Sequence, residues 1–372
     1  MNKQLHIAHV IEPMEHGVFV WVVDMANRLV EDGYRVTVLH SIRKETPENW
    51  RELFDDRVAL VHVQMTRSIS LLQDSKALIK LTRELHRLKP DIIHTHSSKG
   101  GFLARVSGFL LRQNKRLLYT SHAIHYPLIQ QPVKRAIYKV LEHVGYWLGG
   151  TIVACGKEEY DIILKEITYG NKKRLIRISN GIDLKQISPK DYSVRNDKVI
   201  AGVVGRISEQ KAPWVFANIA RDVLARRDDV EFIWIGGGED EDVNMLQEAG
   251  VSVTGMLDRD EVLQRLGSLD IFLQTSAYEG LSLALLEAQA AGIPAVVTKI
   301  PGNDEVVQHG LTGFVGETEK ELTPHLEALI DSAEERQQMG EQAKQYTETH
   351  FSLPAMAEQY KVKYQEIADS LA

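Results

Sequence analysis

Two carboxylates eight residues apart are the clearest chemical feature of the sequence: Glu279 and Glu287, in the stretch YEGLSLALLEAQ. An apolar run at 271–273 predicts a buried strand just before them. Ser282 is a candidate N-cap for a helix over 283–291 that Gly292 closes. The pair therefore lies at the carboxyl end of a strand in a βαβ unit, where open α/β sheets bind ligands. Taken alone, it suggests general acid–base chemistry.

A basic, glycine-containing loop precedes this stretch in the sequence GVVGRISEQK, residues 202–211. A strand that ends at Gly205 and leads into a helix offers backbone amides and a positive helix end to a phosphate. Arg206 can bind phosphate oxygens bidentately, and Lys211 adds a point charge. The glycine spacing matches neither the dinucleotide fingerprint nor the Walker motif. The alternatives that remain are a phosphate site and an ordinary tight turn.

Two further turns could approach a ligand. The strand FIWI leads into three glycines, Gly236 to Gly238, which would let the backbone lie close to a bound molecule. The alternative is a flexible turn before an acidic helix. The turn PGNDE at 301–305 opens another helix, and its acidic residues could simply complement the helix dipole.

Four histidines are candidates for a metal site. His94 and His96 have the i, i+2 spacing of one strand face, and His122 and His125 follow a later strand. They could bind zinc. No carboxylate or cysteine is paired with them locally, so we favour a polar lining of a ligand cleft and predict no metal. Cys155, the only cysteine, lies in an apolar strand and is expected in the core.

Strands and helices alternate along the chain, and this pattern positions all of these residues. In the first half, strands are predicted at 5–11, 35–40, 58–63, 91–95, 117–120 and 151–155, with helices at 18–32, 75–88, 101–111 and 133–148. A second series has strands at 199–205, 232–235, 251–254, 271–273 and 295–298, with helices at 213–226, 241–249, 259–266 and 283–291. Such alternation favours parallel, doubly wound sheets.

We therefore predict an α/β protein with two Rossmann-like doubly wound domains that face a central cleft. The predicted parts are an N-terminal domain at 1–183, a linker at 184–198, a C-terminal domain at 199–353 and a C-terminal helix at 354–372. The linker region is polar and carries little apolar periodicity. Pro354 interrupts a helical tail that begins near 332, so the last helix can turn back towards the N-terminal domain.

Composition excludes several classes of protein. The chain has 372 residues, 44% of them hydrophobic, which allows two well-packed domains. A single cysteine excludes a disulfide scaffold and fits the reducing cytoplasm. No apolar run reaches about 18 residues, so we expect no transmembrane helix. The short apolar run at the N-terminus reads as a first strand rather than a signal peptide.

The charge is distributed unevenly. Residues 1–185 hold 28 Lys and Arg against 19 Asp and Glu, a balance of +9, and residues 186–372 hold 16 against 32, a balance of −16. The first half is thus suited to an anionic partner. Two segments, 102–118 and 133–147, mix apolar and basic residues as membrane-surface helices do. The alternative is a pair of ordinary surface helices.

Taken together, the motifs resemble the retaining glycosyltransferase family 4, which has the two-domain GT-B fold. Besides the acidic pair and GVVGRISEQK, the resemblance rests on DIIHTHSSKGGFLAR at 91–105, RSISLLQD at 67–74, ISNGID at 178–183, GNDEVV at 302–307 and GLTGFV at 310–315. It spans nearly the whole chain. The two N-terminal segments are similar to a branch of bacterial enzymes that build surface polysaccharides, including lipopolysaccharide and capsule.

The resemblance implies roles for individual residues around a nucleoside diphosphate sugar, for which we expect UDP. Glu287 would bind the ribose, Arg206 and Lys211 the diphosphate, and Glu279 the donor sugar. His122 would lie at the sugar side of the cleft, and Gly17, in the loop 15–18, would face the reaction centre, although many relatives have two glycines there. The implied catalytic residues are His122, Arg206, Lys211 and Glu279, and the implied donor-binding residues are Gly17, Gly205, Arg206, Lys211, Gly236, Gly238, Glu279, Gly280, Leu281, Ser282 and Glu287.

The implied function is transfer of a sugar, with UDP-N-acetylhexosamine one candidate donor, to a glycan or polyprenyl-diphosphate-linked acceptor, without a metal or other cofactor. No second carboxylate can be assigned as a nucleophile, so we expect a front-face transfer in which the donor phosphate helps to deprotonate the acceptor. A basic first domain would suit such an acceptor and peripheral contact of residues 102–147 with the inner membrane face. The alternatives are a nucleotide-sugar 2-epimerase of the same architecture and a non-catalytic binding module.

Overall fold

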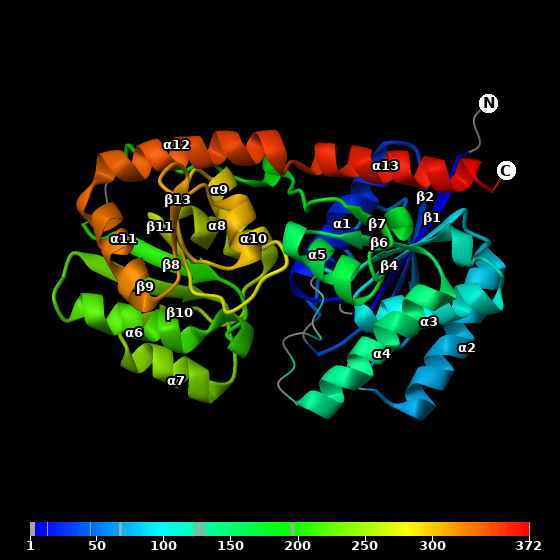
Figure 1. Ribbon diagram of the computed structural model, residues 1–372. Coiled ribbons are helices and arrows are strands. Elements are labelled where there is room, and N and C mark those ends of the chain that lie inside the picture. Colours follow the sequence, from blue (N-terminus) through cyan, green and yellow to red (C-terminus); the bar gives the residue numbers. More distant parts are fainter. Residues whose placement is uncertain are drawn as a thin grey trace. The chain divides into compact units, whose positions relative to one another are not determined.

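The protein is described by a computed structural model that places residues 4–12, 14–44, 46–66, 69–122, 124, 126, 129, 131–194 and 197–371. The chain divides into two compact units (Figure 1). The first unit comprises Met1–Asn180 with Leu353–Ala372, and the second comprises Gly181–Ser352. Among the described residues, no helix has the length and apolar character needed to cross a membrane.

The first unit is built on a parallel sheet of seven strands in the order β3-β2-β1-β4-β5-β6-β7. The strands are β1 (His6–Ile11), β2 (Arg35–His40), β3 (Ala59–His62), β4 (Ile92–His96), β5 (Leu117–Thr120), β6 (Thr151–Ala154) and β7 (Leu175–Arg177). The helices are α1 (His16–Glu31), α2 (Leu71–Leu88), α3 (Ser98–Leu110), α4 (Pro132–Leu148), α5 (Lys157–Glu166) and α13 (Leu353–Asp369), with short 3₁₀ turns at Asn114–Arg116 and Lys172–Arg174.

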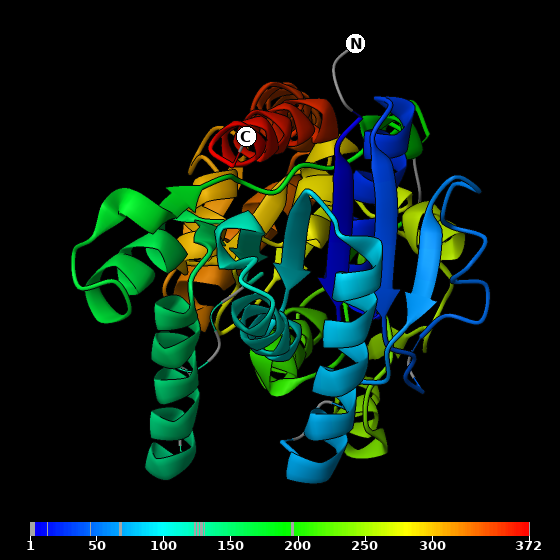
Figure 2. The ribbon, with the colours of Figure 1, turned by 90° about the vertical axis from the view of Figure 1, so that its right-hand side faces the viewer.

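Alternate residues of this sheet point to opposite faces, and each face is covered by helices (Figure 2). Val10 packs with Leu81 of α2 and Leu103 of α3. Its neighbour His9 instead lies against Trp21 of α1, on the face that α13 also covers. The sheet is therefore doubly wound, and both faces of its central strands are removed from water.

The second unit has a parallel sheet of six strands in the order β10-β9-β8-β11-β12-β13. The strands are β8 (Val199–Val204), β9 (Val230–Ile235), β10 (Val251–Val253), β11 (Ile271–Gln274), β12 (Ala295–Thr298) and β13 (Gly313–Gly316). The helices are α6 (Pro213–Leu224), α7 (Asp240–Glu248), α8 (Arg259–Gly267), α9 (Leu283–Ala290), α10 (Pro301–Val306), α11 (Glu319–Asp331) and α12 (Ala333–His350), with 3₁₀ turns at Leu184–Gln186 and Glu209–Lys211.

The predicted fold class is confirmed: both units carry parallel, doubly wound sheets, and the C-terminal helix belongs with the first unit. Helix α12 ends at His350 and α13 begins at Leu353, so Pro354 occupies the second position of α13. There the missing backbone N–H costs no intrahelical hydrogen bond. The break in the helical tail therefore falls where the proline predicts it.

Sequence patterns missed four elements: α5, β7, α11 and β13. Strand β7 has three residues, of which only Leu175 is buried, so it lacks a usable alternation. Helix α11 contains Pro324, which obscured its periodicity. The polar residues after 183 pack on the second unit: the Tyr192 hydroxyl donates to the carbonyl of Gly292 at 2.6 Å.

Candidate functional site

The loops that follow β8 and β11 meet at one edge of the second sheet. The two strands are paired in parallel, with Ile271 opposite Ala201, so both end at the same side. The next strand in sequence after β8 lies on its other side, which makes the β8–β11 junction the point where the strand order reverses. Open α/β sheets bind ligands at such a switch point. The Ala277 amide, donating to the Gln210 carbonyl at 2.8 Å, joins the two loops.

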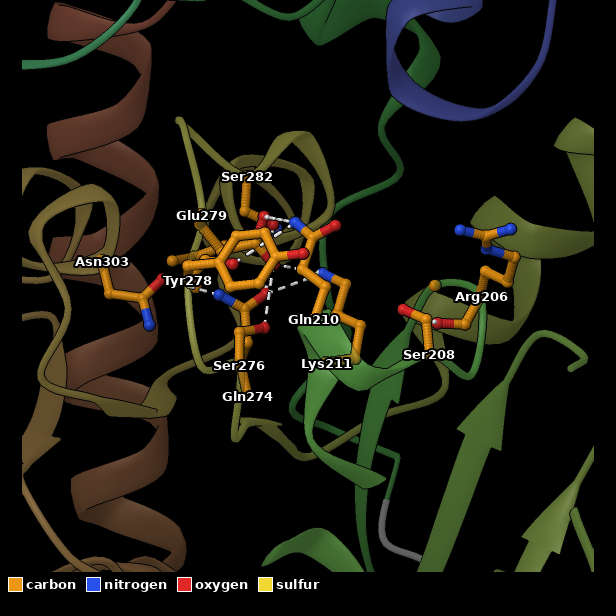
Figure 3. A network of polar contacts seen from close by, with 12 residues as sticks. Arg206, Ser208, Gln210, Lys211, Gln274, Ser276, Tyr278, Glu279, Ser282 and Asn303 are labelled. Atoms are coloured by element: carbon orange, nitrogen blue, oxygen red, sulfur yellow. Dashed lines mark hydrogen bonds and ion pairs between the residues drawn. The ribbon is translucent and has the colours of Figure 1, made fainter. Parts of the chain in front are cut away.

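Lys211 and Glu279 form an ion pair at this junction (Figure 3). The ammonium of Lys211 lies 2.6 Å from Glu279 Oε1 and 3.5 Å from the side-chain oxygen of Gln274. The same carboxylate accepts hydrogen bonds from the Ser276 hydroxyl at 2.8 Å and from Gln210 Nε2 at 3.2 Å. Both oxygens of Glu279 are thus satisfied by protein donors, and the side chain is fixed in one orientation.

Gln274, the last residue of β11, extends this network to the neighbouring helices. Its amide donates to Asn303 Oδ1 at 2.6 Å, and Asn303 in turn donates to the carbonyl of Thr298. The Ser282 hydroxyl donates to Gln274 at 3.1 Å and also accepts from the amide of Leu285, as the predicted N-cap of α9. One chain of hydrogen bonds therefore fixes the end of β11, the start of α9 and the turn at α10.

Arg206 comes from the same loop as Lys211 but lies outside the network (Figure 3). Its backbone carbonyl accepts from the Ser208 hydroxyl at 3.4 Å, whereas its guanidinium has no hydrogen bond or ion pair among the residues that the structure describes. Of the two predicted phosphate-binding cations, Lys211 is thus held by a carboxylate, whereas no described carboxylate forms an ion pair with Arg206. Burial, together with the carboxylates of Glu209 and Glu279, raises the pKa of the Tyr278 hydroxyl beside them, so this hydroxyl stays protonated at neutral pH.

The predicted glycines pack the two turns against each other. Gly205 and Gly236 have φ of +146° and +142°, a region that favours glycine. A Cβ on Gly236 would overlap the carbonyl oxygen of Gly205, and one on Gly238 would overlap Ile207. The indole of Trp234 donates to the Gly205 carbonyl at 2.8 Å. Gly236 therefore lies close to another turn of the same sheet, and approach of this backbone to a ligand stays a prediction.

A similar contact supports the loop that carries Glu279. A Cβ on Gly302, in the first turn of α10, would overlap the carbonyl oxygen of Gly280. Leu281 and Ser282 are buried behind that loop. The turn at Pro301 thus supports the loop that carries Glu279. The acidic residues of the turn did not indicate this role.

Glu287 belongs to a separate polar contact. Its side chain is 2% exposed, and Oε1 accepts from Arg259 Nη2 at 2.6 Å. Arg259 is the first residue of α8, after an Asp258 capping box. Sequence reasoning missed it. The only available signal was that a cation in the first turn of a helix opposes the helix dipole and so needs another partner.

His122 lies in the first unit, half-buried at the end of a row of imidazole rings whose other members, His9, His94 and His96, are buried. Its Nε2 lies 2.9 Å from His96 Nδ1, and His96 Nε2 lies 2.9 Å from His9 Nδ1. His94 contacts the hydroxyl groups of Tyr364 and Thr120. Burial lowers the pKa values of His9 and His122 to about 3, so both rings are neutral at pH 7.

Of the histidines considered for zinc, His94 and His96 are grouped with His9, and these three rings lie close enough to share an ion. Their positions under α1 and α13, with hydrogen-bond partners for His94 and His96, also explain them as core residues. The prediction overlooked His9 because it lies in a different strand, 87 positions before His96. His125 lies outside the described residues.

Gly17 differs from the expectation. It is exposed and belongs to the first turn of α1, which begins at His16 rather than at Val18. The predicted loop at 15–18 is therefore wrong in this respect, because the apolar pattern alone did not reveal the first turn. His122 and Gly17 both belong to the first unit, whereas the other predicted site residues belong to the second.

Two family models together match the chain from residue 16 to residue 346. The model described as "Glycosyltransferase Family 4" matches residues 16–186, and the one described as "Glycosyl transferases group 1" matches residues 185–346. The two parallel Rossmann-like sheets define the GT-B class of fold. The chain belongs to glycosyltransferase family 4, a family of retaining enzymes that use nucleotide sugars.

The chain is also similar in sequence to named relatives, and its fold is similar to that of solved structures. The chain is 29% identical over 296 residues to the UDP-Gal:α-D-GlcNAc-diphosphoundecaprenol α-1,3-galactosyltransferase of Escherichia coli, covering 75% of this chain and 76% of the relative. It is 24% identical to the capsular polysaccharide biosynthesis glycosyltransferase CapM of Staphylococcus aureus, covering 84% and 86%. Its fold is similar to that of sucrose-phosphate synthase from Thermosynechococcus elongatus, with a TM-score of 0.83, 16% identity and coverage of 99% and 100%. Anabaena HepE in complex with UDP and glucose has a TM-score of 0.79, 18% identity and coverage of 98% and 100%.

Proposed function

We propose that this protein transfers a sugar from a UDP-sugar, with retention of configuration, to a glycan or polyprenyl-diphosphate-linked acceptor in bacterial surface polysaccharide synthesis. The observation that carries the proposal is the Lys211–Glu279 network at the switch point of the second sheet, beside Arg206, whose guanidinium forms no hydrogen bond or ion pair among the described residues. The relatives that act on a diphosphoundecaprenol-linked sugar or in capsule synthesis support the acceptor class.

In this proposal each charged group binds a different part of the donor. Arg206 and Lys211 bind the diphosphate, and the amides at the start of α9 add a positive helix end. Glu279 accepts hydrogen bonds from sugar hydroxyls, and Glu287 from the ribose. Lys211 contacts Glu279 at 2.6 Å. The residue that selects the sugar therefore also orients the cation that stabilises the leaving group.

The chemistry follows from the charge that develops on the diphosphate. As the bond from the anomeric carbon to the phosphate oxygen breaks, negative charge grows on that oxygen, where preorganised cations stabilise it most. The acceptor hydroxyl forms the new bond on the same face and gives its proton to the departing phosphate. Glu279 accepts from three protein donors, which reduces its nucleophilicity and favours this front-face route over a covalent intermediate.

The first unit supplies the acceptor side in this proposal. A polyprenyl-diphosphate acceptor is anionic and membrane-borne, which suits the basic first half of the chain. His122 is neutral at pH 7, so it can accept or donate a hydrogen bond to a sugar hydroxyl without adding charge. We therefore propose that the reaction takes place at the cytoplasmic face of the membrane.

The test is a panel of UDP-galactose, UDP-glucose, UDP-N-acetylhexosamines and GDP-mannose, each incubated with a polyprenyl-diphosphate-linked sugar. We expect transfer from one UDP-sugar and an α-linked product by NMR. Glu279→Gln should abolish most of the transfer, whereas the same substitution at Glu248, an exposed carboxylate on α7, should not. A covalent glycosyl adduct on Glu279 would contradict the front-face route.

Two other outcomes would contradict the proposed transfer and favour one of its alternatives. Epimerised UDP-N-acetylglucosamine in the absence of acceptor would indicate the 2-epimerase. Tight binding of a nucleotide sugar with neither transfer nor donor hydrolysis, under conditions in which a related enzyme turns over, would indicate a binding module.

A further inference from the structure

Helix α4 presents an apolar stripe to solvent. Val133, Ile137, Val140, Val144 and Trp147 follow at steps of four and three residues, which places them on one helix face. All five are exposed, by between 43% and 81%. Such a contiguous row on a surface helix marks an interaction surface rather than a chance exposure.

The opposite side of α4 is fixed to the body of the first unit, so the stripe cannot turn inward. Glu142 is buried and accepts from Arg105 of α3 at 3.0 Å and from the Tyr119 hydroxyl at 3.0 Å. Gly145 packs so closely on Arg105 that a side chain there would overlap the guanidinium. The orientation of the helix is therefore set by a buried polar contact, and its apolar face is left for a partner.

The surroundings of the stripe are basic. From 102 to 147 the sequence holds seven Lys and Arg residues and one acidic residue, Glu142, a balance of +6. The single carboxylate is the buried partner of Arg105. Lys134 is exposed at the start of α4, and Arg112 and Lys115 are exposed near its end, where Gly149 packs on Asn114. The exposed charge around the stripe is thus mainly positive: beyond this segment, Glu166 of α5 pairs with Lys139 at 2.7 Å, and the other basic residues named here remain.

The surface continues over the neighbouring helices. Phe109 and Leu110 are exposed at the C-terminal end of α3. On α2, which packs against the other side of α3, the exposed face carries Ile79 between Lys76 and Arg83. Figure 1 shows α2, α3 and α4 in one layer on the side of the sheet away from α13. Exposed apolar and basic side chains therefore occur on all three helices, and Glu84 of α2 pairs with Arg87 of the same helix.

We propose that this face, defined by the α4 stripe with Phe109, Leu110 and the basic residues around them, docks the protein on an anionic lipid bilayer. The apolar residues enter the boundary between headgroups and acyl chains, and the Lys and Arg residues bind lipid phosphates. Trp147 at the end of the stripe suits that boundary. A second copy of the chain is a poorer occupant, because a symmetric dimer would place this basic surface against itself.

The inference extends the proposed function, since a membrane-borne acceptor requires the enzyme to reach the bilayer. It is tested separately by mixing the full-length protein, without donor or acceptor, with phosphatidylglycerol-containing vesicles and with pure phosphatidylcholine vesicles. We expect co-sedimentation with the anionic vesicles only, weakened at high salt. Val140→Glu and Lys134→Glu should each reduce binding by about tenfold or more.

Val362→Glu is the matched control. Val362 is 52% exposed, against 58% for Val140, but it lies on α13, which covers the opposite face of the sheet. This variant should bind vesicles as the wild type does. Circular dichroism and turnover of a short water-soluble acceptor should be unchanged in all three variants. Absent binding to anionic vesicles, or full binding by Val140→Glu, would overturn the proposal.

Two further results separate this inference from its alternatives. A dimer in analytical ultracentrifugation that Val140→Glu dissociates, without vesicle binding, would assign the stripe to a second copy. If the protein binds vesicles but transfers no sugar to any acceptor, the docking surface stands and the proposed function fails. If it transfers sugar to the soluble acceptor but ignores anionic vesicles, the docking inference fails alone.

Discussion

The environment of Lys211 distinguishes its proposed role from that of Arg206. Spacing alone made it one of two equivalent cations, whereas the structure separates them: Lys211 is held by Glu279, and Arg206 is uncommitted among the described residues. A cation already held in place requires little reorganisation when charge develops nearby. We therefore assign transition-state stabilisation mainly to Lys211 and capture of the diphosphate mainly to Arg206.

Replacing Lys211 with alanine should lower kcat by roughly 10² or more, the scale of losing one preorganised charge-stabilising group. Arg206→Ala should raise KM for the donor as well as lower kcat/KM. Arg221→Ala is the control, because Arg221 is exposed on α6 and bonds only to Asn218 among the interactions of the described residues. Steady-state kinetics with the accepted donor provides the measurement. Wild-type kcat in Lys211→Ala would remove the diphosphate assignment.

The buried histidines give a second prediction at this scale, for stability against pH. His9 is fully buried and its pKa falls from 6.5 to about 3 on folding. The unfolded chain therefore binds more protons than the folded one between pH 6.5 and 3. As a result, His9 does not lower the free energy of unfolding above pH 6.5, and lowers it progressively as the pH falls below 6.5. At pH 5 one such residue should cost about 2 kcal/mol.

Urea unfolding at pH 7.5 and pH 5 tests this. His9→Leu should lose less stability between the two pH values than the wild type, even if it is less stable at both. His86→Gln, which changes an exposed histidine of α2, should show the wild-type difference. An unchanged pH dependence in His9→Leu would show that His9 is not neutral by burial.

Among the elements, the short helix α10 has a role that its sequence did not suggest. Its first turn supports the loop of Glu279, since Gly302 lies directly against the Gly280 carbonyl. Asn303 of the same helix accepts from Gln274 at 2.6 Å. An element of six residues therefore determines where the sugar-selecting carboxylate lies.

Gly302→Ala should push the Glu279 loop away from α10 and reduce kcat/KM by roughly 10-fold to 10²-fold, because displacements of about 1 Å are costly in a preorganised site. Gly267→Ala, at the end of α8, meets nothing within 4 Å and should behave as the wild type. Donor kinetics and thermal unfolding of both variants provide the measurement. Equal activity of the two variants would show that α10 does not position the loop.

At the scale of the whole molecule, the last helix of the chain, α13, packs on the first unit rather than on the second. In α13, the Tyr360 ring lies 5.3 Å from Trp21 of α1, and the Tyr364 hydroxyl lies 2.6 Å from His94 of β4. Trp21 also donates to the sulfur of Met356 at 3.1 Å. The last helix thus covers one face of a sheet whose strands all come from the first half of the sequence.

Tyr360→Ala should destabilise the first unit by about 3–5 kcal/mol, the usual cost of removing a buried aromatic side chain. The second unit should be unaffected, because Tyr360 packs within the first. Hydrogen–deuterium exchange read peptide by peptide separates the two units. Tyr169→Ala, at a residue that is 73% exposed, is the control. Equal deprotection of both units would show that α13 does not belong to the first unit alone.

The sequence by itself determined the fold class, because alternating apolar runs and helical periodicity are local signals. It also located the glycines, the acidic pair and the basic loop, since strand-to-helix turns at a sheet edge are readable from spacing. The elements β7 and α11 were not predicted. Strand β7 has only three residues and α11 contains an internal proline, so neither has enough periodicity to detect.

Only the tertiary structure decided which of these residues touch. Lys211 and Glu279 are 68 positions apart, and Arg259 and Glu287 are 28 apart, so their pairing depends on neighbouring strands and on the packing of α8 and α9. His9 joins His96 across 87 positions because β1 and β4 are adjacent. Spacing along the chain predicts which residues lie on the same face of one element. Contacts between elements depend on the order of the strands in the sheet, which the periodicity of the sequence does not encode.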